Sequence, residues 1–225
     1  MSRAFNFEGP VFTFLSRLAD LFWLNLLFIV CCIPVITIGA ATTALYYVTL
    51  KMAKDEEGYI TRSYFKSFKE NFKQATVIWI GFLVVGMIMI TDLRIVNGGN
   101  TAEILSSPAL GNVIMVAVFL MGIVILMVGT YIFPILAQFD NTIKNTAKNA
   151  FLISIRHLPY TIAMLVITAI PVVLIWFFPA LFILVLIMFS ATAYFNSKLF
   201  NKIFVLYMPK EDSSSDPAED INGEG

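Results

Sequence analysis

Charged residues are scarce in this chain of 225 residues, at 13% of the total, while hydrophobic residues make up 59%. An ordinary soluble domain carries about twice that charged fraction. Four runs have no formal charge at all, over residues 21–50, 74–91, 104–139 and 158–197. In hydrocarbon every backbone N–H and C=O must be bonded within its own segment, so runs this long predict membrane-spanning helices. A soluble globular domain is therefore not expected.

Cysteine and histidine are almost missing. The two cysteines, Cys31 and Cys32, are adjacent, and neighbouring cysteines rarely form a disulfide or complete a structural zinc site by themselves. The single histidine, His157, lies beside a predicted membrane boundary without a cluster of cysteine or carboxylate around it. We therefore expect Cys31 and Cys32 to be small apolar fillers and predict no metal site.

Enzyme motifs are missing as well. The sequence has no HExxH or CxxC motif, no P-loop, and no GxGxxG glycine-rich loop. Paired buried carboxylates, or a nucleophile with a histidine and an acid at a readable spacing, are not found either. The sequence thus predicts a protein that is not an enzyme, with no catalytic residues and no cofactor.

The first uncharged run is too long for one helix. At about 1.5 Å per residue its 30 residues would measure about 45 Å, against a hydrocarbon core of about 30 Å. Pro34 and Gly39 bracket a break in the run. The sequence therefore predicts a helix over residues 10–32, a turn at residues 34–39, and a return helix that ends near Lys54.

The later runs complete the predicted topology. A polar loop at residues 55–58 precedes a long helix to about Leu93, for which Thr61 is the expected cap. Another helix follows over about residues 109–139, and the final run of forty residues is long enough for two helices. The fold class is therefore an all-α polytopic membrane protein with about six membrane helices plus a cytoplasmic interfacial helix. Five membrane helices is the second choice.

The distribution of basic residues favours six spans. With six, fourteen of the fifteen lysines and arginines share one side and only Arg94 lies opposite. A single span within residues 21–50 would change that division to twelve and three. The positive-inside rule then predicts a cell-membrane protein with both termini in the cytoplasm. A cleaved signal peptide is the weaker interpretation, because Asp20 and the later spans count against it.

The end of the chain differs from the rest. Residues 211–225 contain six acidic residues and no basic one. Such a segment cannot bury enough apolar surface to offset its ordering entropy. We therefore expect a helical membrane domain over residues 1–209 and a disordered acidic cytoplasmic tail over residues 210–225.

Basic and aromatic side chains alternate where the third predicted helix begins. At about 100° per residue the four basic side chains lie within about 60° of one another, and three phenylalanines form a neighbouring stripe. These residues are Arg62, Phe65, Lys66, Phe68, Lys69, Phe72 and Lys73. One interpretation is an interfacial helix that contacts lipid headgroups. The other is a docking surface for a transport ATPase or permease. Nucleic-acid binding is not expected, because the stripe is short and explained by topology.

Four further residues within the first uncharged run are candidates for packing or for a site. Asn25 is the clearest polar residue in a predicted span, and it either bonds a neighbouring helix or lines a substrate path. Thr37 and Gly39 belong to a small-residue segment that lets helices approach closely. Together with Pro34 they could instead form a broken-helix site.

Several segments resemble the YesL family of bacterial membrane proteins. The most specific is TIGAATTALYY at residues 37–47, with Asn25 and Pro34 before it; others are at residues 9–10, 18–21, 55–58, 68–76 and 156–159. The resemblance implies an integral membrane protein of Gram-positive bacteria that is often encoded beside carbohydrate uptake and breakdown systems. The activity of the family is uncharacterised, so the resemblance assigns no catalytic or ligand residues.

Two functions remain open at this point. The first is a non-enzymatic accessory component of a carbohydrate uptake or utilisation system, docking subunits of an ABC-type sugar transporter through residues 62–73 and 140–156. The second is a small-solute transporter or channel in its own right. That alternative is motivated by the break at residues 34–39, by Pro134, and by a weak internal repeat. The bilayer is the one expected partner common to both, and the sequence does not predict an oligomeric state.

Overall fold

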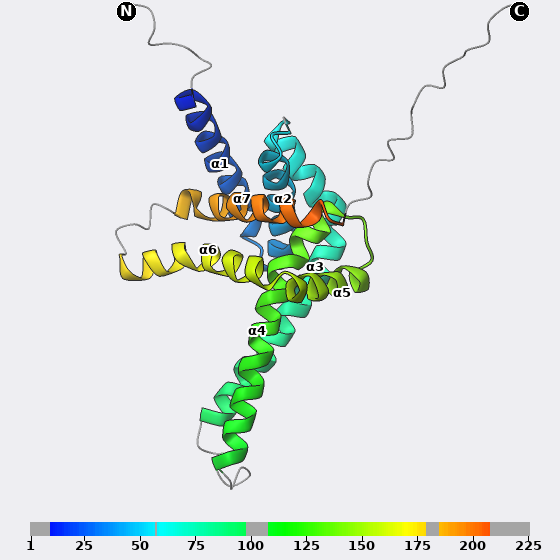
Figure 1. The fold of residues 1–225 in the computed structure, drawn as a ribbon, viewed down its shortest axis with the longest axis vertical. Helices are drawn as coiled ribbons and strands as arrows, with labels where there is room; N and C mark the ends of the chain where they lie inside the picture. The colour runs from blue at the N-terminus through cyan, green and yellow to red at the C-terminus, as the bar shows by residue number, and fades with distance from the viewer. Residues whose placement is uncertain (1–9, 57, 98–107, 179–184, 208–225) are drawn as a thin grey trace, which may run out of the picture.

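The computed structural model describes residues 10–56, 58–97, 108–178 and 185–207, and within them it contains helices but no strand (Figure 1). The all-α prediction is confirmed. The predicted tail at residues 210–225 lies outside the described residues. The helices are α1 (Pro10–Cys32), the short 3-10 helix η1 (Val35–Thr37), α2 (Ile38–Ala53), α3 (Ile60–Asn97), α4 (Pro108–Gln138), α5 (Ile143–Arg156), α6 (Leu158–Phe177) and α7 (Val185–Phe204).

Five of the described helical segments are long and apolar enough to cross a membrane. They are Phe12–Cys32, Val35–Ala53, Ile60–Arg94, Asn112–Gln138 and Leu158–Phe177. Five is the second-choice count from the sequence. The described part of α7, which would be the sixth span, is not among them, and it carries Lys198 and Lys202 in its second half. The polytopic helical architecture stands, and the orientation of the termini remains a prediction.

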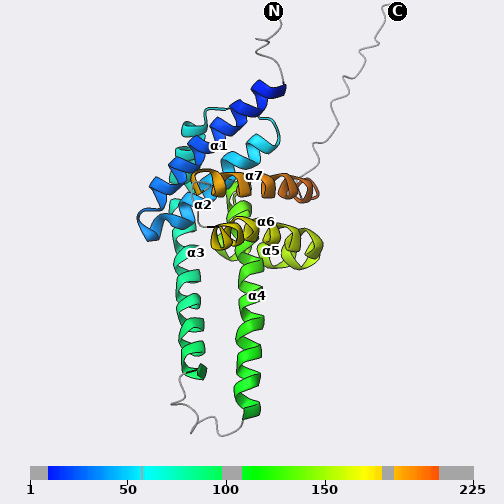
Figure 2. The same ribbon diagram turned by 90° about the vertical axis from the view of Figure 1, so that its left-hand side faces the viewer.

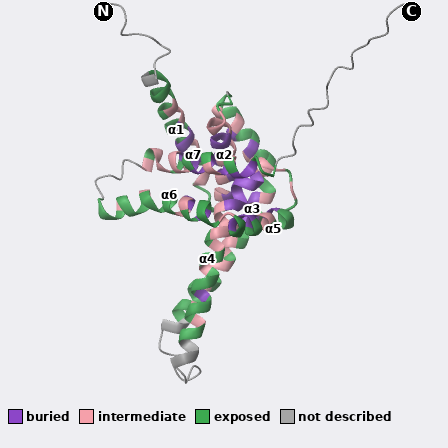
Figure 3. Ribbon diagram, in the orientation of Figure 1, coloured by how far each residue is buried: buried purple, intermediate pink, exposed green. Residues whose placement is uncertain are grey.

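The helices form a head and a stalk (Figures 1 and 2). We define the stalk as residues 77–97 of α3 and 108–128 of α4, which run side by side and, beyond Trp79, extend away from the other helices. The other described residues form the head. Buried residues concentrate in the head, whereas most of the stalk and of α6 is exposed (Figure 3). Large apolar side chains on the stalk surface include Val77, Ile80, Val84, Met87, Ile88, Val113, Val116, Phe119 and Leu120. A surface this apolar is suited to lipid rather than water.

The α6–α7 pair runs across the α3–α4 pair rather than alongside it (Figures 1 and 2). This differs from the predicted topology, in which all of these helices cross the bilayer side by side. Two contacts fix the arrangement. The hydroxyls of Tyr131 in α4 and Thr161 in α6 are hydrogen-bonded at 2.9 Å, and the ring of Phe200 in α7 packs edge-on against Tyr131 with centroids 5.2 Å apart. A local sequence pattern does not encode such crossings, because they depend on contacts between distant residues.

The centre of the head is aromatic. Phe200 is fully buried and also meets the ring of Tyr46 in α2 edge-on, with centroids 5.8 Å apart. Phe204 stacks on Phe200 at 5.4 Å and contacts Phe139, which follows α4, at 5.3 Å. Aromatic pairs of this kind contribute about 0.5–1.5 kcal/mol each beyond the area they bury. The second half of α7 is thus held between α2 and the end of α4.

Close contact between α2 and α3 requires glycine at position 39. A Cβ atom added there would lie 2.4 Å from the carbonyl oxygen of Ala75 and 2.7 Å from Cβ of Trp79, both in α3. The indole N–H of Trp79 also donates to the carbonyl of Val35 in the turn before α2, at 2.8 Å. These contacts set the position of α2 along α3.

Asn25 joins α1 to α7. Its Nδ2 donates to the carbonyl of Val185 at 2.8 Å, and its Oδ1 accepts from the backbone N–H of Ser190 at 3.1 Å. The Ser190 hydroxyl donates back to the carbonyl of Leu21 at 2.6 Å. Asn25 is fully buried, and its described contacts are those of a helix-packing residue.

The loop between α2 and α3 is held from α1. Asp55 has a φ of 58°, a left-handed conformation that aspartate tolerates better than most residues. Its carboxylate accepts a hydrogen bond from Arg17, and this guanidinium holds the pKa of Asp55 below its usual range. Arg17 also donates to the hydroxyl of Tyr194 in α7 at 2.7 Å. The predicted polar loop is present and ties three elements together.

Helix α5 was not predicted. It begins after Thr142, whose hydroxyl accepts from the N–H of Asn145 at 3.4 Å, and it buries Thr146, Ala150 and Ile153 on one face. These spacings of four and three residues are typical of an amphipathic helix. The sequence carries this signal within residues 140–156, for which its pattern predicts only a docking role.

We expect Gly39→Ala to lower the free energy of unfolding by about 1–3 kcal/mol, the usual range for overpacking, because the added methyl meets α3 backbone. Unfolding in detergent micelles measures this. Gly81→Ala is the matched control, since nothing lies within 4 Å of its added Cβ, and better helix propensity should make it neutral or slightly stabilising. Equal stability of the two variants would contradict the close contact.

Asn25→Leu is expected to lower the free energy of unfolding by about 0.6 kcal/mol and at most about 2 kcal/mol, the range measured for interhelical hydrogen bonds in membrane proteins. The control is Thr130→Val, because the Thr130 hydroxyl donates within its own helix, to Leu126 at 2.8 Å. The same micelle assay applies. If the loss in Asn25→Leu did not exceed that in the control, the α1–α7 bonds would not contribute to stability.

Candidate functional site

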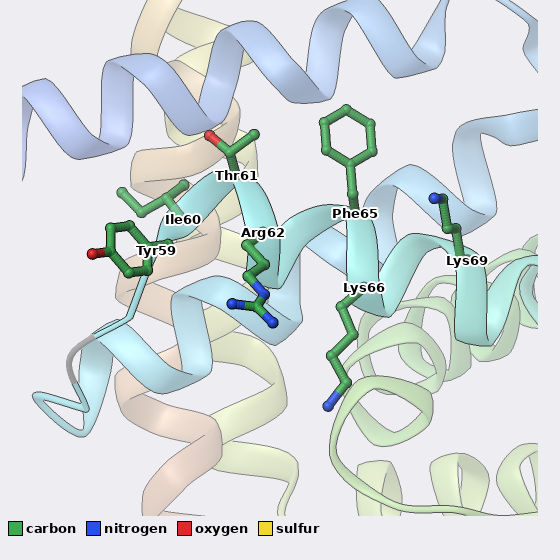
Figure 4. A pocket seen from close by; sticks show the side chains of 7 residues that line it. All are labelled: Tyr59, Ile60, Thr61, Arg62, Phe65, Lys66 and Lys69. Carbon is green, nitrogen blue, oxygen red and sulfur yellow. The ribbon is translucent and has the colours of Figure 1, made fainter.

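The first half of α3 presents a basic and aromatic groove on the head. The groove has a volume of about 600 Å³ and is lined by Tyr59, Ile60, Thr61, Arg62, Phe65, Lys66 and Lys69 (Figure 4). We call these seven residues the basic groove. Tyr59 is 83% exposed and Phe65 is 38% exposed, so both rings are accessible from outside the head. Sequence reasoning missed Tyr59, which precedes the helix and therefore lies outside its periodic pattern.

The predicted stripe of basic and aromatic residues does not form a single line on α3. Figure 4 shows Thr61, Phe65 and Lys69 on one side of α3, with Arg62 and Lys66 on the other. Phe72 and Lys73 are exposed further along the same helix. The basic side chains thus cover a broad face rather than a narrow line.

Phe68 is the exception among the predicted residues. Its ring stacks on buried Tyr64 with centroids 6.4 Å apart and packs against the core of the head. Phe68 lies about 60° around the helix from Phe65, toward Tyr64, which is enough to turn it inward. Only two of the three phenylalanines, Phe65 and Phe72, therefore belong to the exposed face.

Helix α1 positions the start of α3. The indole N–H of Trp23 donates to the hydroxyl of Thr61 at 2.9 Å. Helix α3 begins at Ile60, so Thr61 is already inside the helix and is not the cap that the sequence suggested. The hydroxyl instead joins α1 to the basic groove.

A polar cleft lies beside the basic groove, between α2, α3 and the connection from α4 to α5. Its volume is about 720 Å³. The lining residues are Tyr47, Lys66, Glu70, Asn71, Gln74, Leu136, Ala137, Gln138, Phe139, Asp140, Asn141 and Thr142. Lys66 lines both the basic groove and the polar cleft. The sequence signal for the cleft was the run of polar residues directly after the apolar α4.

One atom in the lining of the polar cleft is unsatisfied. Oε1 of Gln74 is buried and has no hydrogen-bond partner within the described structure. A buried acceptor without a donor costs about 1–3 kcal/mol. Its neighbour Asn71 is oriented by its Nδ2, which donates to the carbonyl of Ser67 at 3.1 Å. Gln74 therefore lines the cleft with an acceptor that becomes reachable when its side chain turns toward the cleft.

The other four predicted residues are not brought together into one site. Pro34 and Thr37 lie in the turn between α1 and α2, where the Thr37 hydroxyl donates to the carbonyl of Cys31 at 2.6 Å. Gly39 contacts α3, while Asn25 bonds α7. Of the two interpretations, helix packing describes their contacts.

A metal centre is not formed by the described residues, among which no group of three or more histidine, cysteine or acidic side chains could hold an ion. The ring of His157 instead shares a hydrogen bond with the hydroxyl of Tyr207 at 3.2 Å. The candidate site therefore consists of the basic groove, with its exposed aromatic rings, and the neighbouring polar cleft, which is rich in hydrogen-bonding groups.

Comparison with known proteins finds one matching family and two similar bacterial proteins. Residues 21–93 match the family described as "Protein of unknown function, DUF624". The uncharacterized protein YteU of Bacillus subtilis (strain 168) is 26% identical over 150 residues, covering 66% of this chain and 63% of YteU. The uncharacterized protein YesL of the same strain is 25% identical over 153 residues, covering 68% of each chain. The match thus spans less than two thirds of YteU.

No solved structure matches this chain. The family match contains the second half of α1, all of α2 and nearly all of α3, including the whole basic groove. Together with the helical fold and the apolar stalk, these findings confirm the resemblance predicted from the sequence: the chain is similar to YesL and YteU and has the fold of a helical membrane protein.

Proposed function

We propose that this chain is a non-enzymatic accessory protein of a carbohydrate uptake system, which docks an acidic surface of a transporter subunit through the basic groove. The observation that carries the proposal is the continuity of α3. The charged half and the apolar half of this helix form one uninterrupted helix of 38 residues.

The length of α3 determines how far its charges stand from the bilayer. Between Lys73 and Asp92 it has only uncharged residues, a distance of about 28 Å that matches the hydrocarbon core. With α3 near the bilayer normal, Lys73 then lies at the boundary of the hydrocarbon. Lys66 lies about 10 Å and Arg62 about 16 Å beyond Lys73.

These distances favour a protein partner over lipid headgroups. The headgroup region adds only about 5–7 Å on each side of the core. Lys69 and Lys73 fall within reach of that layer, but Arg62 and the exposed Tyr59 stand beyond it. Had the segment lain flat on the membrane as a separate interfacial helix, all of its charges would have shared one depth.

The chemistry of the basic groove is that of a protein interface. Arginine and aromatic side chains are enriched in interface cores and among the residues that dominate binding energy. Arg62, Tyr59 and Phe65 supply these types, and the net positive charge of the groove calls for an acidic partner surface. The second predicted docking segment, residues 140–156, adjoins the basic groove through the polar cleft that Lys66 also lines.

The choice of a carbohydrate transporter as partner rests on the family resemblance. YesL-like proteins are expected beside carbohydrate uptake and breakdown systems, which makes the permease and ATPase subunits of an ABC-type sugar transporter the first partners to test. A cytoplasmic position of the basic groove follows from the positive-inside rule.

We expect the double variant Arg62→Glu/Lys69→Glu to reduce co-purification of sugar-transporter subunits from native membrane at least tenfold. The control is Lys198→Glu/Lys202→Glu, which reverses two exposed charges on α7 and should retain the partner. A reporter at the C-terminus checks that neither variant changes topology. Failure to recover transporter subunits with the unaltered protein, or equal recovery with both variants, would overturn the proposal.

A further inference from the structure

We infer that the polar cleft binds a small polyhydroxylated ligand, such as a free sugar or a polyol. The cleft is separate from the basic groove except for Lys66, and the inference does not depend on the docking of a partner. Its volume of about 720 Å³ lies within the range of about 300–1,000 Å³ that is usual for small-molecule sites.

The lining is unusually polar for a ligand site. Most small-molecule pockets are predominantly apolar, with a few polar groups that fix orientation. Here nine of the twelve lining residues carry a polar side-chain group. A ligand that gains from this lining must itself carry many hydrogen-bonding groups.

Carboxamides dominate these polar groups. The cleft contains Asn71, Gln74, Gln138 and Asn141, contributed by α3, by the end of α4 and by the connection to α5. Each carboxamide offers an acceptor oxygen and two N–H donors, and a ligand hydroxyl likewise both donates and accepts. Neutral hydroxyl groups therefore match this set better than a ligand that only donates or only accepts.

The charged groups of the lining point to a neutral ligand. Lys66 is the one cation among the lining residues, and Glu70 and Asp140 are its two acids. A phosphate or other anion would face more negative than positive charge. Carboxylates also accept well from hydroxyl groups, and the Lys66 ammonium donates to them. A polyhydroxylated molecule can use all three without bringing a charge of its own.

An observation separate from the composition of the lining concerns the hydrogen bonding of Gln74. Its buried Oε1 has no donor within the described structure, although Gln74 lines the cleft. This oxygen has almost no accessible surface, so a ligand hydroxyl can donate to it only after the Gln74 side chain turns toward the cleft. The rings of Tyr47 and Phe139 add apolar surface to the same lining, which suits the C–H faces of a sugar ring.

Equilibrium dialysis of the purified full chain in detergent tests the inference, with radiolabelled glucose, maltose and sorbitol as probes and inorganic phosphate and glycine as comparison ligands. We expect saturable binding of at least one of the three hydroxylated probes, and weaker or no binding of phosphate and glycine. If none of the three binds, or if phosphate or glycine binds more tightly, the inference is overturned.

Substitutions then locate the binding. Gln74→Leu should weaken binding at least tenfold, whereas Asn145→Leu, which removes an exposed carboxamide outside the cleft, should leave it unchanged. Asp140→Asn provides a second test at an exposed position, should Gln74→Leu fail to fold. Unchanged binding in a folded Gln74→Leu variant, or in Asp140→Asn, would place the ligand elsewhere and overturn the inference. Arg62→Glu/Lys69→Glu should keep the ligand, which separates this outcome from that of docking.

Discussion

The structure depends on α3 being one uninterrupted helix whose first half is charged and whose second half is mostly apolar. Its first half carries five charged side chains and packs against α2, and its second half exposes mostly apolar ones. A helix rises only about 1.5 Å per residue, so in the proposed arrangement the change at Gln74 would place a membrane surface at a definite height on the molecule. The basic groove lies above that height, and the polar cleft lies at it.

The head gives α3 its fixed neighbours. The missing side chain at Gly39 lets α2 approach α3 closely, and Trp23 and Arg17 attach α1 to the start of α3 and to the loop before it. Helix α7 is joined to α1 by the hydrogen bonds of Asn25 and to α4 by the buried ring of Phe200, which packs against Tyr131. The basic groove and the polar cleft are consequently positioned by helices that pack against one another.

Lys66 connects the two candidate surfaces. It lines the basic groove on one side and the polar cleft on the other, so a molecule in the cleft would change the charge and hydration next to a docked partner. Two distinct surfaces that share a residue give this fold a physical route by which ligand occupancy and partner docking could influence each other. The α3–α4 stalk and its lipid-facing side chains would supply the anchor.

The sequence by itself determined the membrane character, the bounds of α1 and α2 to within a residue or two, and the position of the basic residues, because charge-free runs and helix breakers act locally. It missed α5, and it placed Phe68 with the exposed rings although Tyr64 draws it inward. Only the tertiary structure decided that α6 and α7 lie across the stalk, and that Gln74 and Asp140 line one cleft. Those outcomes depend on contacts between residues far apart in the chain, and a periodic pattern carries no information about them.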